Sequence, residues 1–126
     1  MNKYFLNVRA KTRYSIFCVG VLIIGCATSY KNITAEMPDL TLIADGMYRG
    51  YYDLSSTPIK VTLDVRVQNQ KVTGIEIVDH SCSPIGKKAE KIIDSITERQ
   101  SLDVDVISGA TASSKAILKA VENALQ

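Results

Sequence analysis

Apolar and polar side chains alternate strictly over residues 59–67. Period two is typical of a β-strand with one buried face, because successive side chains point to opposite faces. A polar stretch at 68–71 follows, in which Asn69 tolerates the positive φ of a tight turn. A second apolar pattern at 72–77 completes a predicted antiparallel hairpin. The apolar positions are Ile59, Val61, Leu63, Val65 and Val67 on the first strand and Val72, Ile75 and Ile77 on the second.

From Lys87 onward the apolar residues recur with the helical period of about 3.6 residues. One amphipathic helix is predicted there and a second from about Ser113 to Leu125, with a short extended return at 102–106 between them. These elements predict an α+β fold: a small antiparallel β-sheet with two packed helices, the C-terminal helix following the loop at 108–111. The apolar stripes are Ala89, Ile92, Ile93 and Ile96, then Ala116, Ile117, Ala120, Val121 and Ala124.

The first 25 residues have a different pattern. Four basic residues and no acidic residue precede an uncharged run at 15–24. That run is shorter than the roughly 20 residues of a membrane span, and a short apolar run behind a basic segment is typical of a secretory signal. The basic residues are Lys3, Arg9, Lys11 and Arg13.

The uncharged run ends in Ile23-Ile24-Gly25-Cys26, which resembles a bacterial lipobox. The resemblance implies cleavage after Gly25 and a lipid on the Cys26 thiol, which would anchor the chain stably to a membrane. A plain signal peptide or an uncleaved anchor, with Cys26 incidental, is the alternative. We therefore predict a lipoprotein signal peptide at 1–25, a lipid-anchored tether at 26–44, and an extracytoplasmic, membrane-anchored bacterial lipoprotein.

Removal of the signal would reverse the sign of the net charge. The chain has 15 basic and 13 acidic residues, but the signal contains four of the basic ones and none of the acidic ones. The apparent basicity therefore belongs to the signal, and nothing favours nucleic-acid binding. Cys18 would leave with the signal and Cys26 would be acylated. Cys82 would then stand alone, which excludes an internal disulfide.

Few residues are suited to catalysis. His80 is the only histidine, which argues against a Ser-His-Asp triad and against a zinc site built from several His and Cys residues. Asp103 and Asp105 share a face of the extended return, but a solvated strand face is the simpler interpretation of that pair. The sequence leaves enzymatic activity undecided and favours a module that is not an enzyme by itself.

Small and hydroxyl-bearing residues gather just before the last helix. The first turn of a helix has unpaired N–H groups and a partial positive charge, which suit a phosphate. Small residues let a ligand approach the backbone, and hydroxyls add donors. An ordinary Ser/Thr helix cap explains the same residues, so both interpretations stay open at this point. The residues concerned are Ser108, Gly109, Ala110, Thr111, Ser113 and Ser114.

Three stretches resemble the FMN-binding domain family. Residues 100–125 resemble its C-terminal signature, the hairpin ending at 78–81 resembles its central hairpin, and residues 45–50 resemble its opening Asp-Gly-x-Tyr-x-Gly. The family includes domains of flavoprotein reductases, extracytoplasmic electron-transfer lipoproteins, and flavin subunits of the sodium-pumping NADH:quinone oxidoreductase and its Rnf relatives. The resemblance makes residues 45–126 an FMN-binding domain. The residues matching the opening motif are Asp45, Gly46, Tyr48 and Gly50.

The resemblance also implies a cofactor and its attachment. FMN would be joined to Thr111 through a phosphoester made by a separate Mg²⁺-dependent flavin transferase that uses FAD. Asp105, three residues before the Ser-Gly-Ala-Thr run, matches the motif that this transferase recognises. The family often has a His in the loop that starts at His80, near the flavin, although Cys82 and Ser83 stand where Glu-Thr is usual. The implied cofactor-binding residues are Thr111, Ser108, Gly109, Ala110, Ser113, Ser114 and His80.

Two functions follow from the resemblance. The first is a membrane-anchored electron carrier with FMN covalently bound through a Thr phosphoester, working with a membrane electron donor or a partner reductase. The chain has no nicotinamide-binding fingerprint, which favours relay over catalysis. The alternative is a noncovalent FMN-binding sensor or scaffold module of a partner redox complex. His80 is either a hydrogen-bond donor beside the flavin or a residue that orders its loop.

Overall fold

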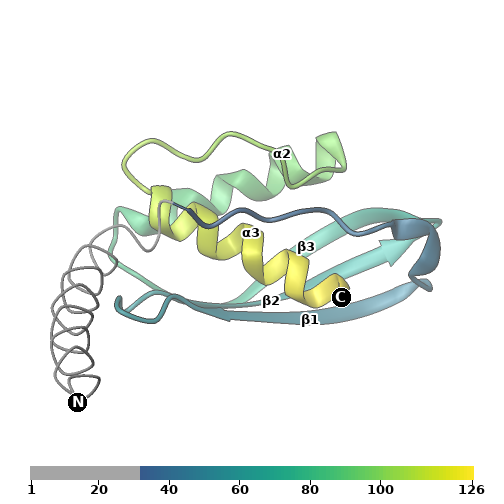
Figure 1. The fold of residues 1–126 in the computed structure, drawn as a ribbon, viewed down its shortest axis with the longest axis horizontal. Coiled ribbons are helices and arrows are strands. Elements are labelled where there is room, and N and C mark those ends of the chain that lie inside the picture. The colour runs from purple at the N-terminus through teal and green to yellow at the C-terminus, as the bar shows by residue number, and fades with distance from the viewer. Residues whose placement is uncertain (1–31) are drawn as a thin grey trace, which may run out of the picture. The chain divides into compact units, whose positions relative to one another are not determined.

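The computed structural model describes residues 32–126, of which Ile33–Gln126 form one compact unit. The predicted signal peptide and Cys26 lie outside the described residues. Within the compact unit, a short 3₁₀ turn and three strands are followed by three helical segments (Figure 1). In chain order these are η1 (Leu40–Leu42), β1 (Gly46–Asp53), β2 (Lys60–Gln68), β3 (Lys71–Ser81), η2 (Gly86–Lys91), α2 (Ile92–Arg99) and α3 (Thr111–Leu125).

The three strands form one antiparallel sheet in the order β1-β2-β3. The predicted hairpin is confirmed as β2 and β3, although β3 runs on to Ser81. Asn69 and Gln70 have φ of 51° and 61°, and two consecutive positive φ values are typical of a tight hairpin turn whose twist matches that of the strands. The alternation in β2 has the predicted effect, because its four valine and leucine side chains are fully buried. They are Val61, Leu63, Val65 and Val67.

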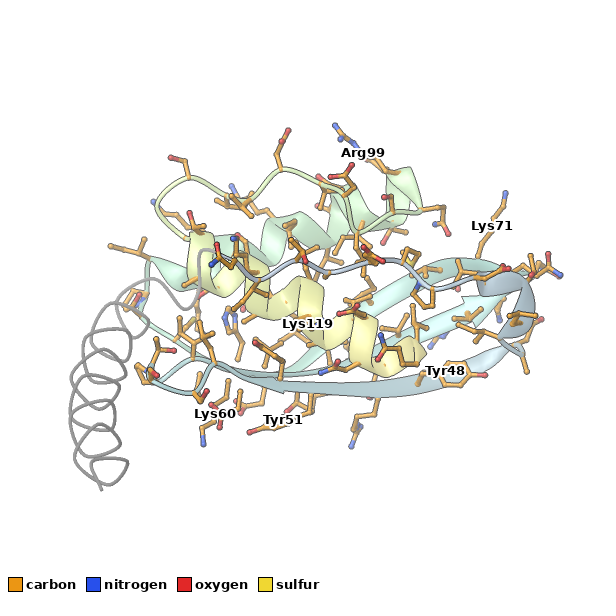
Figure 2. The ribbon with its side chains drawn as sticks, viewed as in Figure 1. Tyr48, Tyr51, Lys60, Lys71, Arg99 and Lys119 are labelled. Carbon is orange, nitrogen blue, oxygen red and sulfur yellow. The ribbon has the colours of Figure 1, made fainter. Side chains whose placement is uncertain are left out.

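Helices cover one face of the sheet, which confirms the α+β fold. α3 packs across β1 and β2, and α2 packs against β3 (Figure 1). A Cβ at Gly50 would lie 1.9 Å from the backbone oxygen of Ala120, so only glycine allows β1 and α3 to come this close. The opposite face of the sheet is open, and Figure 2 shows Tyr51 and Lys60 on the side away from α3.

The helices begin differently from the prediction. The first helical pattern starts as the 3₁₀ turn η2 and becomes α-helical only at Ile92. α3 begins at Thr111 rather than near Ser113. The predicted return at 102–106 is extended but belongs to no strand, because it crosses on the helical side of the domain, where no neighbouring strand pairs with it (Figure 1).

The compact unit begins before Asp45. Residues 33–44 fall within the predicted tether, yet their apolar side chains pack against the core. The Glu36 N–H also donates to the Glu122 carboxylate of α3 at 3.4 Å. The domain therefore starts near Ile33. Among residues 32–126, no helix is long and apolar enough to cross a membrane. The packed side chains of this segment are Ala35, Met37, Leu40 and Ile43.

Candidate functional site

A tight turn leads into α3 and places the small-residue run at the surface. Ser108 and Gly109 are exposed, Gly109 has a φ of 79°, and no atom would lie within 4 Å of a Cβ added there. The Ala110 N–H donates to the Ile107 carbonyl at 2.9 Å and closes the turn. Glycine adopts a positive φ without a steric penalty, so Gly109 allows the turn its shape while leaving its outer side open.

Thr111 is the first residue of α3 and is partly exposed. Its N-terminal neighbour, Ala110, provides no side-chain cap. Within the described residues no group hydrogen-bonds to the Thr111 hydroxyl. The first N–H groups of a helix have no partner inside the helix, and their partial positive charge favours an anion. A free hydroxyl therefore stands beside backbone donors at the helix end.

The two serines of the first turn point into the domain instead. The Ser114 hydroxyl is fully buried, donates to the Ala110 carbonyl at 2.8 Å, and accepts the Ile107 N–H at 3.1 Å. Ser113 is 3% exposed, and a Cβ at Gly86 would lie only 2.6 Å from its hydroxyl oxygen. The hydroxyls of Ser113 and Ser114 are therefore turned away from the surface on which Thr111 lies.

His80 lies at the inner face of β3, opposite Val61. Its side chain is 2% exposed, and Nδ1 lies 3.1 Å from a Glu90 carboxylate oxygen. This contact connects β3 to η2. Nε2 is buried and has no hydrogen-bond partner among the described residues. It is the atom of His80 that a ligand could still use.

Cys82 lies in the loop after β3, at the point where this loop contacts the first turn of α3. A Cβ at Gly86 would lie 3.1 Å from Cys82 Sγ as well as close to Ser113, so these three residues meet. Burial raises the pKa of the Cys82 thiol, and the negative charge of Glu90 raises it further, against smaller opposite effects from Lys87 and the Ser113 hydroxyl. The thiol is therefore protonated at neutral pH and is a poor nucleophile.

A groove of about 510 Å³ opens on the Thr111 face of α3. Its walls include Leu102, Val104, Lys115 and Leu118, and Lys115 follows Thr111 by one helical turn. The volume is within the range of small-molecule sites, about 300–1,000 Å³. Asp103 and Asp105 lie exposed on the segment that leads to the turn. Residues 32–126 contain no cluster of His, Cys, Asp or Glu able to hold a metal ion.

The sequence predicts a helix that starts near Ser113, two residues after Thr111, whereas α3 starts at Thr111 itself, and the structure brings the loop after β3 against the same helix. No sequence pattern predicts that Gly86 contacts Ser113 or that Glu90 contacts His80. Gly86 ends the loop before the predicted helix and Glu90 lies on the charged face of that helix, and periodicity does not report such contacts. The one sequence signal at Gly86 is the glycine itself, because glycine allows a close approach of neighbouring groups.

Comparison with known proteins identifies one domain. The model of a family described as the FMN-binding domain matches residues 55–126, a range that contains His80, Asp105 and Thr111. The residues that resemble the opening motif precede this range. A protein of Treponema pallidum (strain Nichols) described as an uncharacterized protein is 39% identical over 69 residues. The match covers 53% of this chain and 19% of that protein, so the chain spans about a fifth of its relative's length.

Proposed function

This chain belongs to the FMN-binding domain family, and from that premise we propose that it is an extracytoplasmic, membrane-anchored electron carrier with FMN joined to Thr111. The family model covers more than half of the chain and implies that the chain is a flavoprotein with FMN as its cofactor. The proposal adds the covalent bond, the location and the role in electron transfer.

The main support for attachment of FMN to Thr111 is that the Thr111 side chain is partly exposed. Four hydroxyls surround the start of α3, and those of Ser113 and Ser114 are buried. Ser108 is exposed but lies in the turn before the helix, whereas Thr111 is beside the unpaired N–H groups of the first turn. A phosphate esterified to Thr111 is therefore the one that these donors and the helix dipole can stabilise.

The attachment is a group transfer without change of oxidation state. The Thr111 oxygen forms a new bond to the phosphorus of the FMN half of FAD, and the P–O bond of the FAD pyrophosphate breaks. AMP leaves, and the hydroxyl proton passes to a base of the transferase. Asp105 is exposed on the segment before the turn, where a transferase can reach it.

The residues around Thr111 fit FMN in two respects. The helix end offers donors for the phosphate, and the groove beside Lys115 and Leu118 offers apolar walls for a ring. His80, whose buried Nε2 has no partner among the described residues, lies on β3 and does not line this groove. FMN supplies the redox chemistry when bound. The helix end would hold the phosphate, the groove would take the ring, and an ester bond on Thr111 would prevent loss of the cofactor by dilution outside the cell.

The predicted anchor supports a donor in the membrane. Ile33 borders the groove that lies one turn from Thr111, and Cys26 precedes it by only seven residues. Seven residues span at most about 25 Å when fully extended. A lipid on Cys26 would therefore keep the flavin end of the domain near the membrane surface, within reach of a membrane-bound electron donor or partner reductase.

One experiment tests the covalent bond. The chain is coexpressed with a flavin transferase, and the denatured protein is inspected under ultraviolet light on a gel and weighed by intact mass spectrometry. We expect flavin fluorescence that migrates with the chain, is lost in Thr111→Ala and persists in Ser108→Ala. A mass without added FMN refutes the covalent bond. Flavin that is released on denaturation supports the noncovalent sensor or scaffold instead.

Two further measurements test the role and the location. The purified flavoprotein should be reduced by a chemical donor and reoxidised rapidly by an acceptor, as a carrier requires. The wild-type chain should fractionate with membranes and Cys26→Ala should not. A flavin that cannot be cycled in this way contradicts electron transfer and leaves a binding or sensing role.

A further inference from the structure

We propose that Ser114 is a positioning residue whose buried hydroxyl holds the 107–110 turn in the shape that presents Thr111 to the flavin transferase. This inference rests on the proposed function, because it explains how the attachment site is held. Ser114 does not touch the flavin in this proposal; it acts through the backbone of the turn.

One hydroxyl connects both ends of the turn. Ser114 Oγ donates to the Ala110 carbonyl at 2.8 Å and accepts the Ile107 N–H at 3.1 Å. The Ser114 N–H also donates to the Ala110 carbonyl at 2.9 Å, and the Ala110 N–H donates to the Ile107 carbonyl at 2.9 Å. Ser114 is fully buried, so water cannot replace these bonds.

The hydrogen bond from the Ile107 N–H distinguishes Ser114 from most serines within helices. A Ser or Thr hydroxyl in a helix commonly bonds the carbonyl four residues earlier, as Thr97 does to Ile93 at 3.0 Å in α2. That bond stays within the helix. Ser114 in addition accepts an N–H from Ile107, which lies before the helix and outside it. The hydroxyl therefore fixes the incoming chain relative to the helix.

The turn needs support from inside because its outer side has none. Helices are usually capped by Ser, Thr, Asp or Asn, but the capping position of α3 is Ala110, which has no side-chain cap bond. Ser108 and Gly109 are exposed, and a Cβ at Gly109 would meet no atom within 4 Å. The bonds of Ser114 hold the turn from inside and leave the first N–H groups of α3 available to an anion.

Thr111 directly follows Ala110, so the orientation of its hydroxyl depends on the backbone of the turn. Group transfer is sensitive to the placement of the attacking atom, and a shift of about 1 Å can cost about a hundredfold in rate. If the turn samples other shapes, the reactive shape is populated for a smaller fraction of the time. Loss of the Ser114 hydroxyl should therefore slow flavin transfer more than it destabilises the fold.

The test compares Ser114→Ala with Thr97→Ala, which removes a hydroxyl bonded in the same way within α2. Purified chains are incubated with flavin transferase, FAD and Mg²⁺, and kcat/KM for the acceptor chain is measured from in-gel flavin fluorescence. We expect about a tenfold loss for Ser114→Ala, corresponding to 1.4 kcal/mol, and less than about a twofold loss for Thr97→Ala.

A second readout follows the turn itself and does not depend on the flavin. The Ile107 amide should exchange its hydrogen faster in Ser114→Ala than in the wild type, whereas Thr97→Ala should leave that amide unchanged. Ser114→Thr keeps the hydroxyl and should transfer flavin near the wild-type rate, which guards against a Ser114→Ala chain that does not fold. A folded Ser114→Thr as slow as Ser114→Ala overturns the proposal.

The outcomes separate this inference from the proposed function. If the wild type carries no flavin on Thr111, the proposed function fails. If the wild type is flavinylated and Ser114→Ala is flavinylated at the same rate, the positioning role is overturned and the proposed function stands. Slow transfer together with faster exchange at Ile107 supports both.

Discussion

The two ends of α3 are held in place by different kinds of contact. Toward its C-terminus the helix presents small side chains to β1, and Ala120 approaches Gly50 so closely that a single added carbon would overlap with backbone. At its N-terminus the first turn makes hydrogen bonds through Ser114 and packs Ser113 against Gly86. Thr111 is the first residue of this turn and is partly exposed.

This difference indicates that the body of α3 mainly stabilises the fold, whereas its first turn mainly positions Thr111. Close packing in the body of α3 is insensitive to direction but intolerant of added volume, because interiors are packed to high density. Hydrogen bonds in the first turn are directional and fix an orientation with little buried apolar area. A change in the body should therefore unfold the domain, whereas a change at the first turn should alter the presentation of Thr111 while the fold persists.

The largest effect is expected from Gly50→Ala. The new Cβ would lie 1.9 Å from the Ala120 oxygen and 2.8 Å from the Ala124 Cβ, so β1 and α3 must separate. Overpacking costs about 1–3 kcal/mol in ordinary cores, and contact with backbone places this variant at or above the upper end. Urea unfolding followed by circular dichroism measures the loss.

Gly74→Ala is the matched control for that variant. A Cβ at Gly74 would meet no atom within 4 Å, although Gly74 also lies in the sheet. Its free energy of unfolding should stay within about 0.5 kcal/mol of the wild type, as for other surface changes. Equal losses in the two alanine variants would mean that strand conformation, and not the approach of α3, determines the cost.

A smaller effect is expected from Gly86→Ala at the other end of the helix. The new Cβ would lie 2.6 Å from the Ser113 hydroxyl, a side-chain atom that can move, so the cost should be about 1–2 kcal/mol. Ser113→Ala removes that oxygen and should recover part of the loss in the double variant. The coupling is read from a double-mutant cycle of urea unfolding. Strict additivity would show that Gly86 and Ser113 do not press on each other.

The smallest effect is a change in the titration of Cys82. Burial and the charge of Glu90 raise its pKa, so the folded state favours the neutral thiol. That contribution to stability is complete below the pKa of the unfolded thiol and is lost as the pH rises through the higher folded value. Alkylation by iodoacetamide, read at the Cys82 peptide by mass spectrometry, should have a higher midpoint pH in the folded chain than in urea.

Ser113→Ala tests whether the Ser113 hydroxyl contributes to the pKa of Cys82. The Ser113 hydroxyl is one of two groups that lower the pKa of Cys82, so its removal should shift the alkylation midpoint of the folded chain upward. The midpoint in urea should not change. A midpoint that is equal in folded and unfolded chains would mean that the Cys82 thiol is not held against the first turn of α3.

Alternation of apolar and polar residues corresponds to a strand in the hairpin but not in the return at 102–106. Alternation reports which face a side chain is on, and in β2 that face is covered by α3. At 102–106 the burial partly alternates too, with Leu102 buried and Asp103 exposed, but no strand lies beside the segment. A strand requires backbone partners as well as a buried face, and the pattern of a single segment contains no information about its neighbours.

The candidate site was predicted as a set of residues but not as an arrangement. The sequence placed Thr111, Ser113 and Ser114 near the start of a helix, where all three could have faced a phosphate. A start at Thr111 turns the two serines inward, toward Gly86 and toward the Ile107–Ala110 turn. The sequence leaves two roles open for His80, because it does not show that Glu90 is the partner of His80 across the loop.

The sequence by itself determined the periodicities, and with them the hairpin, the helices and the α+β class, because those depend on residues close together in the chain. Its motifs also determined the family. The tertiary structure decided which hydroxyl is exposed and which are buried, because burial depends on groups that are distant in sequence, such as Gly86 against Ser113. Thr111 therefore differs from Ser113 and Ser114 because distant parts of the chain pack against the two serines and bury them.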